Sequence, residues 1–159
     1  MIENWQIESI PDADSLYFRI HKQNVFDNKE LKNIIRPRAF CNTPASGSNM
    51  STDWSKYATP QSTLDHVSKQ YKTGKTEFKN TADFSVVRFS VGKIKEIDKN
   101  HHVLHDPIQN IPEIIGDPNN RAHAIVDGKI SGDKEDSLEA RVLFVENAMW
   151  EILPKLEFL

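Results

Sequence analysis

Apolar and polar residues alternate along two short stretches of the chain, and this period of two predicts β-strands. The first strand is expected over residues 16–21, which are rich in aromatic and branched side chains. One of its faces carries Leu16, Phe18 and Ile20, and the other carries Tyr17, Arg19 and His21. The polar face is either the solvent side of an antiparallel strand, which is the more frequent case, or part of a site.

A second strand is expected over residues 121–126, between a turn at 117–120 and the dipeptide Asp127-Gly128. One of its faces carries Ala122, Ala124 and Val126. The other face carries Arg121, His123 and Ile125. The preceding residues 105–118 hold three prolines and are expected to form a loop. His123 is therefore expected beside a guanidinium near the start of a strand.

The longest strand signal lies at residues 84–97, where a glycine interrupts the pattern and indicates a bulge or bend. Arg88 stands in a largely apolar row of this strand and would need a partner if it were buried. It is expected either on an edge strand or in a polar site. Elsewhere we expect a short helix at 28–35, a short strand from Ala39-Phe40, and a flexible loop at 42–52.

Two longer stretches have the periodicity of helices. The first helix is expected over residues 60–72, because Thr59 is a good N-cap and Pro60 suits the first helical position. The second is expected over residues 134–153; it begins with two acids and stops at Pro154. Its apolar stripe, expected to lie in the core, comprises Leu138, Val142, Val145, Met149 and Ile152.

These elements predict a single α+β domain over residues 1–159, with a mostly antiparallel, strongly bent sheet packed by the two main helices. The 38% hydrophobic and 27% charged residues are typical of a globular protein. A net charge of −3 is not typical of a protein that binds duplex nucleic acid along its whole length. A local basic patch leaves nucleic-acid binding open.

The chain has one cysteine, Cys41, which excludes an internal disulfide and a multi-cysteine zinc site. Cys41 has no locatable catalytic partner and no GxSxG motif occurs, so nucleophilic catalysis receives little weight. No apolar stretch approaches the roughly 20 residues that cross a bilayer, and the N-terminal pattern is not that of a signal peptide. We therefore expect a cytoplasmic protein that does not enter a membrane.

Four of the six histidines lie within residues 101–129. Histidine exchanges protons near neutral pH, which makes it the usual general acid or base. A catalytic zinc site would need three convergent ligands, and the spacing does not identify them. No metal ligand and no cofactor is assigned.

A joint Arg/His site is the more attractive interpretation. Guanidinium groups select phosphate or carboxylate and imidazoles move protons, so the combination suits nucleotides and other phosphorylated molecules. A folded sheet would have to bring together the candidates, which are Arg19, His21, Arg36, Arg38, Arg88, Arg121 and His123. Exposed strand faces would give the same residues, so the sequence leaves both interpretations open.

Several runs resemble a family of small uncharacterised bacterial proteins: MSTDWSKY at 50–57, FSVVRFSVGKIKEI at 84–97, and above all HDP at 105–107 followed by NNRAHAIVDGK at 119–129. That family has an MSVD-like motif and a final HDP…NPAHAxVxGKK pattern, and the resemblance covers roughly residues 16–130. Here Arg121 stands where the family has proline, and the basic ending is shorter. The resemblance implies a site at His105, Asp106 and His123 without naming a reaction.

A weaker likeness is to compact ADP-ribosyltransferase-type folds. They place an arginine or histidine on an early strand, a position that Arg19 or His21 would occupy here. The late catalytic glutamate of those folds has no convincing match, and the candidates are Glu96 and Glu113.

Two hypotheses follow. In the first, an enzyme or ligand-binding protein acts on a nucleotide or other phosphorylated molecule, with His123 as acid and base. The residues that would support His123 or hold the ligand are His105, Asp106, Arg19, His21, Arg38, Arg88 and Arg121. In the second, a non-catalytic interaction module, such as half of a bacterial defence or toxin–antitoxin pair, binds a protein partner through the 105–118 loop and its isoleucines.

Overall fold

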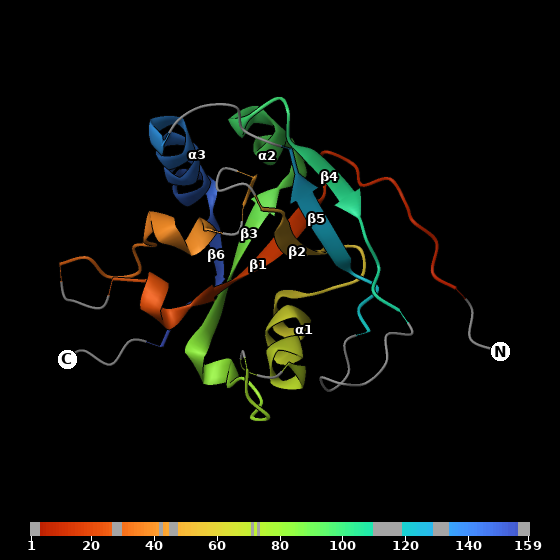
Figure 1. Ribbon diagram of the computed structural model, residues 1–159, viewed down its shortest axis with the longest axis horizontal. Coiled ribbons are helices and arrows are strands. Elements are labelled where there is room, and N and C mark those ends of the chain that lie inside the picture. Colours follow the sequence, from red (N-terminus) through yellow and green to blue (C-terminus); the bar gives the residue numbers. More distant parts are fainter. Residues whose placement is uncertain are drawn as a thin grey trace.

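Six β-strands form one antiparallel sheet in the order β4-β5-β2-β1-β3-β6 (Figure 1). A computed structural model describes residues 4–26, 30–41, 43–44, 48–70, 72, 74–109, 119–128 and 134–155. The strands are β1 Ser15–His21, β2 Met50–Trp54, β3 Phe84–Ser90, β4 His102–His105, β5 His123–Asp127 and β6 Met149–Ile152. With the helices α1 Pro60–Asp65, α2 Val91–Ile97 and α3 Lys134–Asn147, they confirm the predicted α+β class and antiparallel sheet.

The two strands predicted from alternation, β1 and β5, are both present, and their apolar faces are buried. Leu16 and Ile20 are fully buried on β1, as are Ala124 and Val126 on β5. β1 lies between β2 and β3 in the sheet, and it pairs with β3 along its whole length. The polar face of β1 is therefore held in fixed register with its neighbours.

The strand predicted over 84–97 is only half correct, because it ends at Ser90 and the chain turns into α2. The Ser90 side chain accepts a hydrogen bond from the backbone N–H of Lys93 at 3.1 Å, which is an N-cap. Val91 and Ile94 are buried three residues apart, which is a helical spacing. The glycine between them thus marks a change from strand to helix rather than a bulge.

Helix α1 begins as predicted and is shorter than predicted. The Thr59 side chain accepts from the backbone N–H of Ser62, and the Ser62 hydroxyl stands within 2.9 Å of the backbone N–H of Thr59, so the two form a capping box. The α-helix ends at Asp65 and continues as a 3-10 turn over His66–Lys69. Helix α1 and this turn therefore form a short cover over one face of the sheet.

The predicted core stripe of the last helix is largely wrong, because Val145 is its one member within the helix that packs against the core. Leu138 is 52% exposed and Val142 is 37% exposed, whereas Ala140 and Phe144 are buried. Helix α3 ends at Asn147, and the following residues pair with β3 as strand β6. The prediction treated residues 134–153 as one continuous helix. It therefore placed Leu138 and Val142 in the core, whereas both are exposed to solvent.

Two predictions for the region between β1 and α1 are also wrong. Residues 37–40 form a 3-10 turn that buries Ala39 and Phe40, instead of leading into a strand. The loop predicted over 42–52 ends earlier, because β2 begins at Met50. The helix predicted at 28–35 lies partly outside the described residues, and its last residue, Ile35, pairs with Val25 in an isolated bridge.

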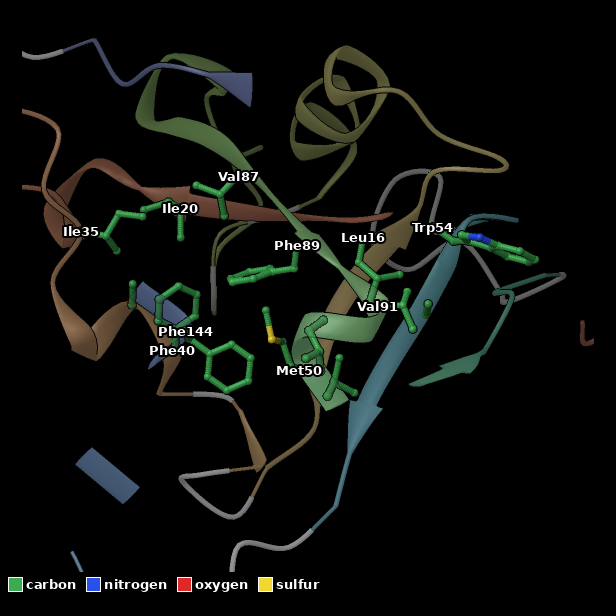
Figure 2. Packing of buried hydrophobic residues seen from close by; sticks show 14 of the residues in the cluster. Leu16, Ile20, Ile35, Phe40, Met50, Trp54, Val87, Phe89, Val91 and Phe144 are labelled. Atoms are coloured by element: carbon green, nitrogen blue, oxygen red, sulfur yellow. The ribbon is translucent and has the colours of Figure 1, made fainter. Parts of the chain in front are cut away.

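The core lies on one face of the sheet, under α2 and α3 (Figure 2). Phe40, Phe89 and Phe144 form a mutual aromatic cluster with ring centroids 5.5–5.8 Å apart. In Figure 1, α1 lies on the other side of the sheet, away from α2 and α3. That second face carries the polar side chains of β1, β2 and β5.

Within the described residues, no helix combines the length and the apolar composition that crossing a membrane requires.

Candidate functional site

A cavity of about 330 Å³ opens between the polar face of the sheet and the segment formed by α1 and the turn after it. A volume of this order is sufficient for a small-molecule ligand. The cavity walls are polar and carry both charges. They consist of Tyr17, Arg19, Ser51, Thr52, Asp53, Thr63, His66, Gln70, Lys79, Ile108, Asn120 and His123.

Strand register explains how residues far apart in sequence meet at this cavity. Tyr17 of β1 is paired with Asp53 of β2, and Asp53 is paired with His123 of β5. The three side chains therefore form one row across three neighbouring strands. Arg19 and Ser51 each lie two residues from this row along their strands, and since side chains alternate, they project from the same face.

Arg19 carries a half-buried guanidinium in which one nitrogen has no hydrogen-bond partner. Its Nη1 atom is buried and has no hydrogen-bond partner. Burial lowers the pKa of Arg19, and the negative charge of Asp53 partly opposes this shift. Removing a cation from water without an ion pair is costly, so the Arg19 guanidinium would favour an anion in the cavity that the residue lines.

Lys79 is a second cation at the same cavity. Burial lowers the pKa of its ammonium group, and the neighbouring charge of Arg19 lowers it further. No ion pair joins Lys79 to another residue in the described ranges. Two cations that disfavour each other would both be stabilised by one shared anion.

Thr63 supplies an unused hydroxyl. Its side chain is 2% exposed, lines the cavity from α1, and has no hydrogen-bond partner for Oγ1. Buried hydroxyls are normally paired, since leaving one unpaired costs free energy. Arg19 of the sheet and Thr63 of the helix thus line one cavity, and each has a buried polar atom without a hydrogen-bond partner.

Asp53 is the acidic member of the site. It is 8% exposed, and its Oδ1 atom accepts a hydrogen bond from Asn120 Nδ2 at 2.8 Å. The Asn120 Oδ1 atom in turn accepts from the backbone N–H of Ala122 at 3.1 Å. Asp53 is therefore oriented by a fixed amide, and it offsets part of the positive charge of the empty cavity.

His123 is held by Asp106 on one side and faces Ser51 on the other. Its Nδ1 atom lies 2.8 Å from the main-chain oxygen of Asp106 and 3.3 Å from the Oδ2 carboxylate oxygen. Its Nε2 atom lies 3.0 Å from Ser51 Oγ. A carbonyl oxygen only accepts hydrogen bonds, so neutral His123 carries its proton on Nδ1 and leaves Nε2 as the acceptor.

His105 does not lie beside His123 in the cavity, where it was expected to support that residue. Its Nδ1 atom accepts the backbone N–H of Glu8 at 3.1 Å, and Nε2–H donates to the main-chain oxygen of Arg121 at 2.7 Å. The ring is buried, packs against Trp54 and Tyr57, and does not line the cavity. Both ring nitrogens form hydrogen bonds to the backbone, so His105 connects the N-terminal segment at Glu8 to Arg121, just before β5.

Two candidate arginines do not line the cavity. Arg38 is exposed, donates from Nη2 to the main-chain oxygen of Gln23 at 2.8 Å, and donates from Nε to Asn24 at 3.1 Å. Arg88 forms an ion pair with Glu151 at 2.8 Å next to β6. We expected Arg38 or Arg88 beside Arg19, but the second cation that lines the cavity with Arg19 is Lys79.

Arg121 and His21 lie beside the cavity rather than in it. The Arg121 guanidinium stacks over the Tyr57 ring at 4.3 Å from the centroid, in a neighbouring depression that shares Asp53, His66 and Asn120 with the cavity. His21 accepts the backbone N–H of Gln23 at 3.1 Å and lines a second depression that shares Lys79. Arg36 stacks on Phe26, on another part of the molecule.

The sequence did not predict several residues of the site, among them Ser51, Asp53, Thr63, Lys79 and Asn120. Ser51 and Asp53 had a usable signal, because Met50, Thr52 and Trp54 alternate with them and are buried. Thr63 and Lys79 gave no such signal. Tertiary packing brings both residues to the sheet, and no local sequence pattern predicts it.

The proline-rich segment contributes Ile108 to the cavity wall, and its other isoleucines, at positions 111, 114 and 115, lie outside the described residues. Among the residues that the structure describes, no group of three or more His, Cys, Asp and Glu side chains is arranged to hold a metal ion. Comparison of the chain with protein-family models, with curated proteins and with solved structures found no match.

Proposed function

We propose that this protein binds a small phosphorylated molecule in the cavity and that His123 transfers protons to and from it. The observation that carries the proposal is that Arg19 lines the cavity and has a buried Nη1 atom without a hydrogen-bond partner. Arginine binds phosphate oxygens through charged, directional hydrogen bonds. Lys79 adds a second positive charge and Thr63 adds a hydroxyl, so three groups are available for one tetrahedral anion.

The cavity also distinguishes a phosphorylated organic molecule from free phosphate. It holds an acidic and amide pair, Asp53 and Asn120, beside the aromatic ring of Tyr17. A ligand with an anionic end and a hydrogen-bond donor at its other end would use both halves of the cavity. Nucleotides and sugar phosphates have this combination of groups.

His123 has the geometry of a general base. The Asp106 contacts hold Nδ1 as a donor, so the free electron pair of Nε2 points toward the Ser51 hydroxyl at the cavity. Nε2 takes a proton from a hydroxyl or a water and returns it to a leaving group. The Asp106 carboxylate stabilises the imidazolium that forms in between.

Isothermal titration calorimetry with inorganic phosphate and with a nucleoside monophosphate tests the proposal. Wild type should bind both, and Arg19→Met should lose at least tenfold in affinity, since hydrogen bonds between charged groups contribute about 1.5–3 kcal/mol. Arg38→Met is the matched control, because Arg38 is an exposed arginine outside the cavity. Equal losses in the two variants, or no binding to wild type, would refute the proposal.

A further inference from the structure

Ser51 occupies the position of a nucleophile activated by a base. Its hydroxyl lies 3.0 Å from His123 Nε2, and its side chain lines the cavity that holds Arg19 and Lys79. Ser51 is exposed, whereas its strand neighbours Met50 and Thr52 are buried. The hydroxyl therefore stands at the boundary between the base and the space that a ligand would fill.

The direction of the hydrogen bond follows from the other side of the imidazole ring. Since His123 Nδ1 donates to the main-chain oxygen of Asp106, Nε2 of the neutral ring has no proton. The Ser51 hydroxyl must donate to it. A serine hydroxyl that donates to a histidine oriented by an acidic residue is the arrangement that makes serine nucleophilic.

We propose that Ser51 is the nucleophile that accepts the phosphoryl group of a phosphomonoester, an inference that rests on the function proposed above. The Ser51 oxygen forms a bond to phosphorus while the bond from phosphorus to the leaving alkoxide oxygen breaks. The Ser51 proton passes to His123 Nε2, and from there to the leaving oxygen. A water oxygen then forms a bond to the phosphorus of the phosphoserine and gives a proton to Nε2. The bond from phosphorus to the Ser51 oxygen breaks, Nε2 returns the proton to that oxygen, and inorganic phosphate leaves.

The charges of the cavity favour phosphorus over carbon as the atom attacked. A phosphomonoester is a dianion near neutral pH, and an approaching serine oxygen is repelled unless that charge is offset. Arg19 and Lys79 supply two positive charges at the same cavity. Preorganised cations of this kind stabilise a transferring phosphoryl group without reorganisation during the reaction.

Asp106 acts as a positioning residue. The main chain of Asp106 already holds the ring through its carbonyl oxygen at 2.8 Å, which is closer than the carboxylate at 3.3 Å. Asp106→Asn therefore keeps the orientation of His123 and removes only the negative charge. It is expected to slow turnover less than His123→Ala, and to reduce kcat rather than raise KM.

The experiment uses two reagents on the full chain. With p-nitrophenyl phosphate, rapid acid quench followed by peptide mass spectrometry should find phosphoserine at Ser51. An alkyl fluorophosphonate should give a permanent adduct at the same residue, because the Ser51 oxygen displaces fluoride and nothing hydrolyses the product quickly. Ser51→Ala should abolish both modifications and turnover, and His123→Ala should slow both.

Ser68→Ala is the control, because Ser68 is an exposed serine whose hydroxyl donates to the main-chain oxygen of Asp65 outside the cavity. It should behave as wild type. If wild type binds phosphate in calorimetry but neither reagent modifies Ser51, or if Ser51→Ala turns over p-nitrophenyl phosphate at the wild-type rate, the nucleophile is refuted and the binding site stands. If wild type does not bind phosphate, the proposed function fails, and this inference fails with it.

Discussion

Arg19 lowers the pKa of Lys79, so the two cations of the cavity are within electrostatic reach of each other. They line the cavity together with Asp53, His66 and His123, and His21 and Asp83 lie on the far side of Lys79. The charge of Arg19 disfavours the charged form of Lys79, and a bound anion would offset this repulsion. The first prediction concerns the pH at which this arrangement loses its charge.

Phosphate affinity should fall as the pH rises through the lowered pKa of Lys79, that is, beginning below the ordinary lysine value of about 10.4. The sign follows because the charged form binds the anion and is lost at high pH. Lys79→Arg keeps its charge and should extend binding to higher pH. Calorimetric titrations over a pH series measure both curves, and superimposable curves would contradict this role for Lys79.

Arg19→Met should leave the free energy of unfolding unchanged or raise it by up to about 1–2 kcal/mol, because the substitution removes a buried charge that has no ion pair. Arg88→Met is the comparison, since it breaks a half-exposed ion pair with Glu151 and should cost at most about 1 kcal/mol. Urea denaturation measures both. A large loss of stability in Arg19→Met would show that Arg19 is structural.

Thr63→Val should be neutral or stabilising, because it removes a buried hydroxyl without a partner, and it should weaken phosphate binding. Thr52→Val has the opposite expectation. The Thr52 hydroxyl donates to the main-chain oxygen of Ala124 at 3.0 Å, so its removal should cost about 1–2 kcal/mol. Thermal denaturation ranks the two variants, and the reverse order would count against an unsatisfied Thr63.

His105→Ala and His123→Ala should separate structure from function. His105→Ala leaves the backbone N–H of Glu8 and the main-chain oxygen of Arg121 without their hydrogen-bond partner. It should lower the free energy of unfolding by about 2–3 kcal/mol. His123→Ala should cost less than about 1 kcal/mol, since its loss strands one backbone oxygen at the exposed Asp106. Guanidinium denaturation distinguishes them. If His123→Ala is the more destabilising change, its role is in folding.

Phe144→Ala should cost about 3–5 kcal/mol, because its ring is fully buried between Phe40 and Phe89. Leu138→Ala, on the exposed side of the same helix, should change stability by less than about 0.5 kcal/mol. Chemical denaturation of the pair tests which face of α3 packs on the sheet. Similar costs would mean that the face assigned to the core is wrong.

Local patterns were sufficient for the strands that carry the site. On β1, large apolar residues alternate with Tyr17 and Arg19, and such a strand has one arrangement that buries its apolar side. The same argument places His123 on one face of its strand and Ala122 and Ala124 on the other face. Alternation thus predicted which side chains share a face, and the antiparallel sheet confirms that part of the fold.

Local patterns failed where a tertiary contact decided the outcome. Helix α3 has apolar residues on more than one face, and the docking of Phe144 onto Phe40 selects between them. Ser51 was assigned to a loop over residues 42–52 because that stretch has few apolar residues, and Asp53 was assigned to no element. Pairing with β5 places them in a strand.

The composition of the cavity could be predicted only in part. Arg19 and His123 lie on strands that the sequence identifies, and register brings those strands to one cavity through β2. Arg38 and Arg88 have the same chemistry as Arg19, and only the geometry separates them from it. Charge type alone does not determine which of several arginines faces a ligand.

The most direct test of the phosphate site is a crystal structure of the protein soaked with a nucleoside monophosphate. We expect density for the phosphate within hydrogen-bond distance of the Arg19 guanidinium, with Lys79 and Thr63 as its other contacts. Density at a different surface, or a cavity left without ligand while calorimetry reports saturation, would contradict it.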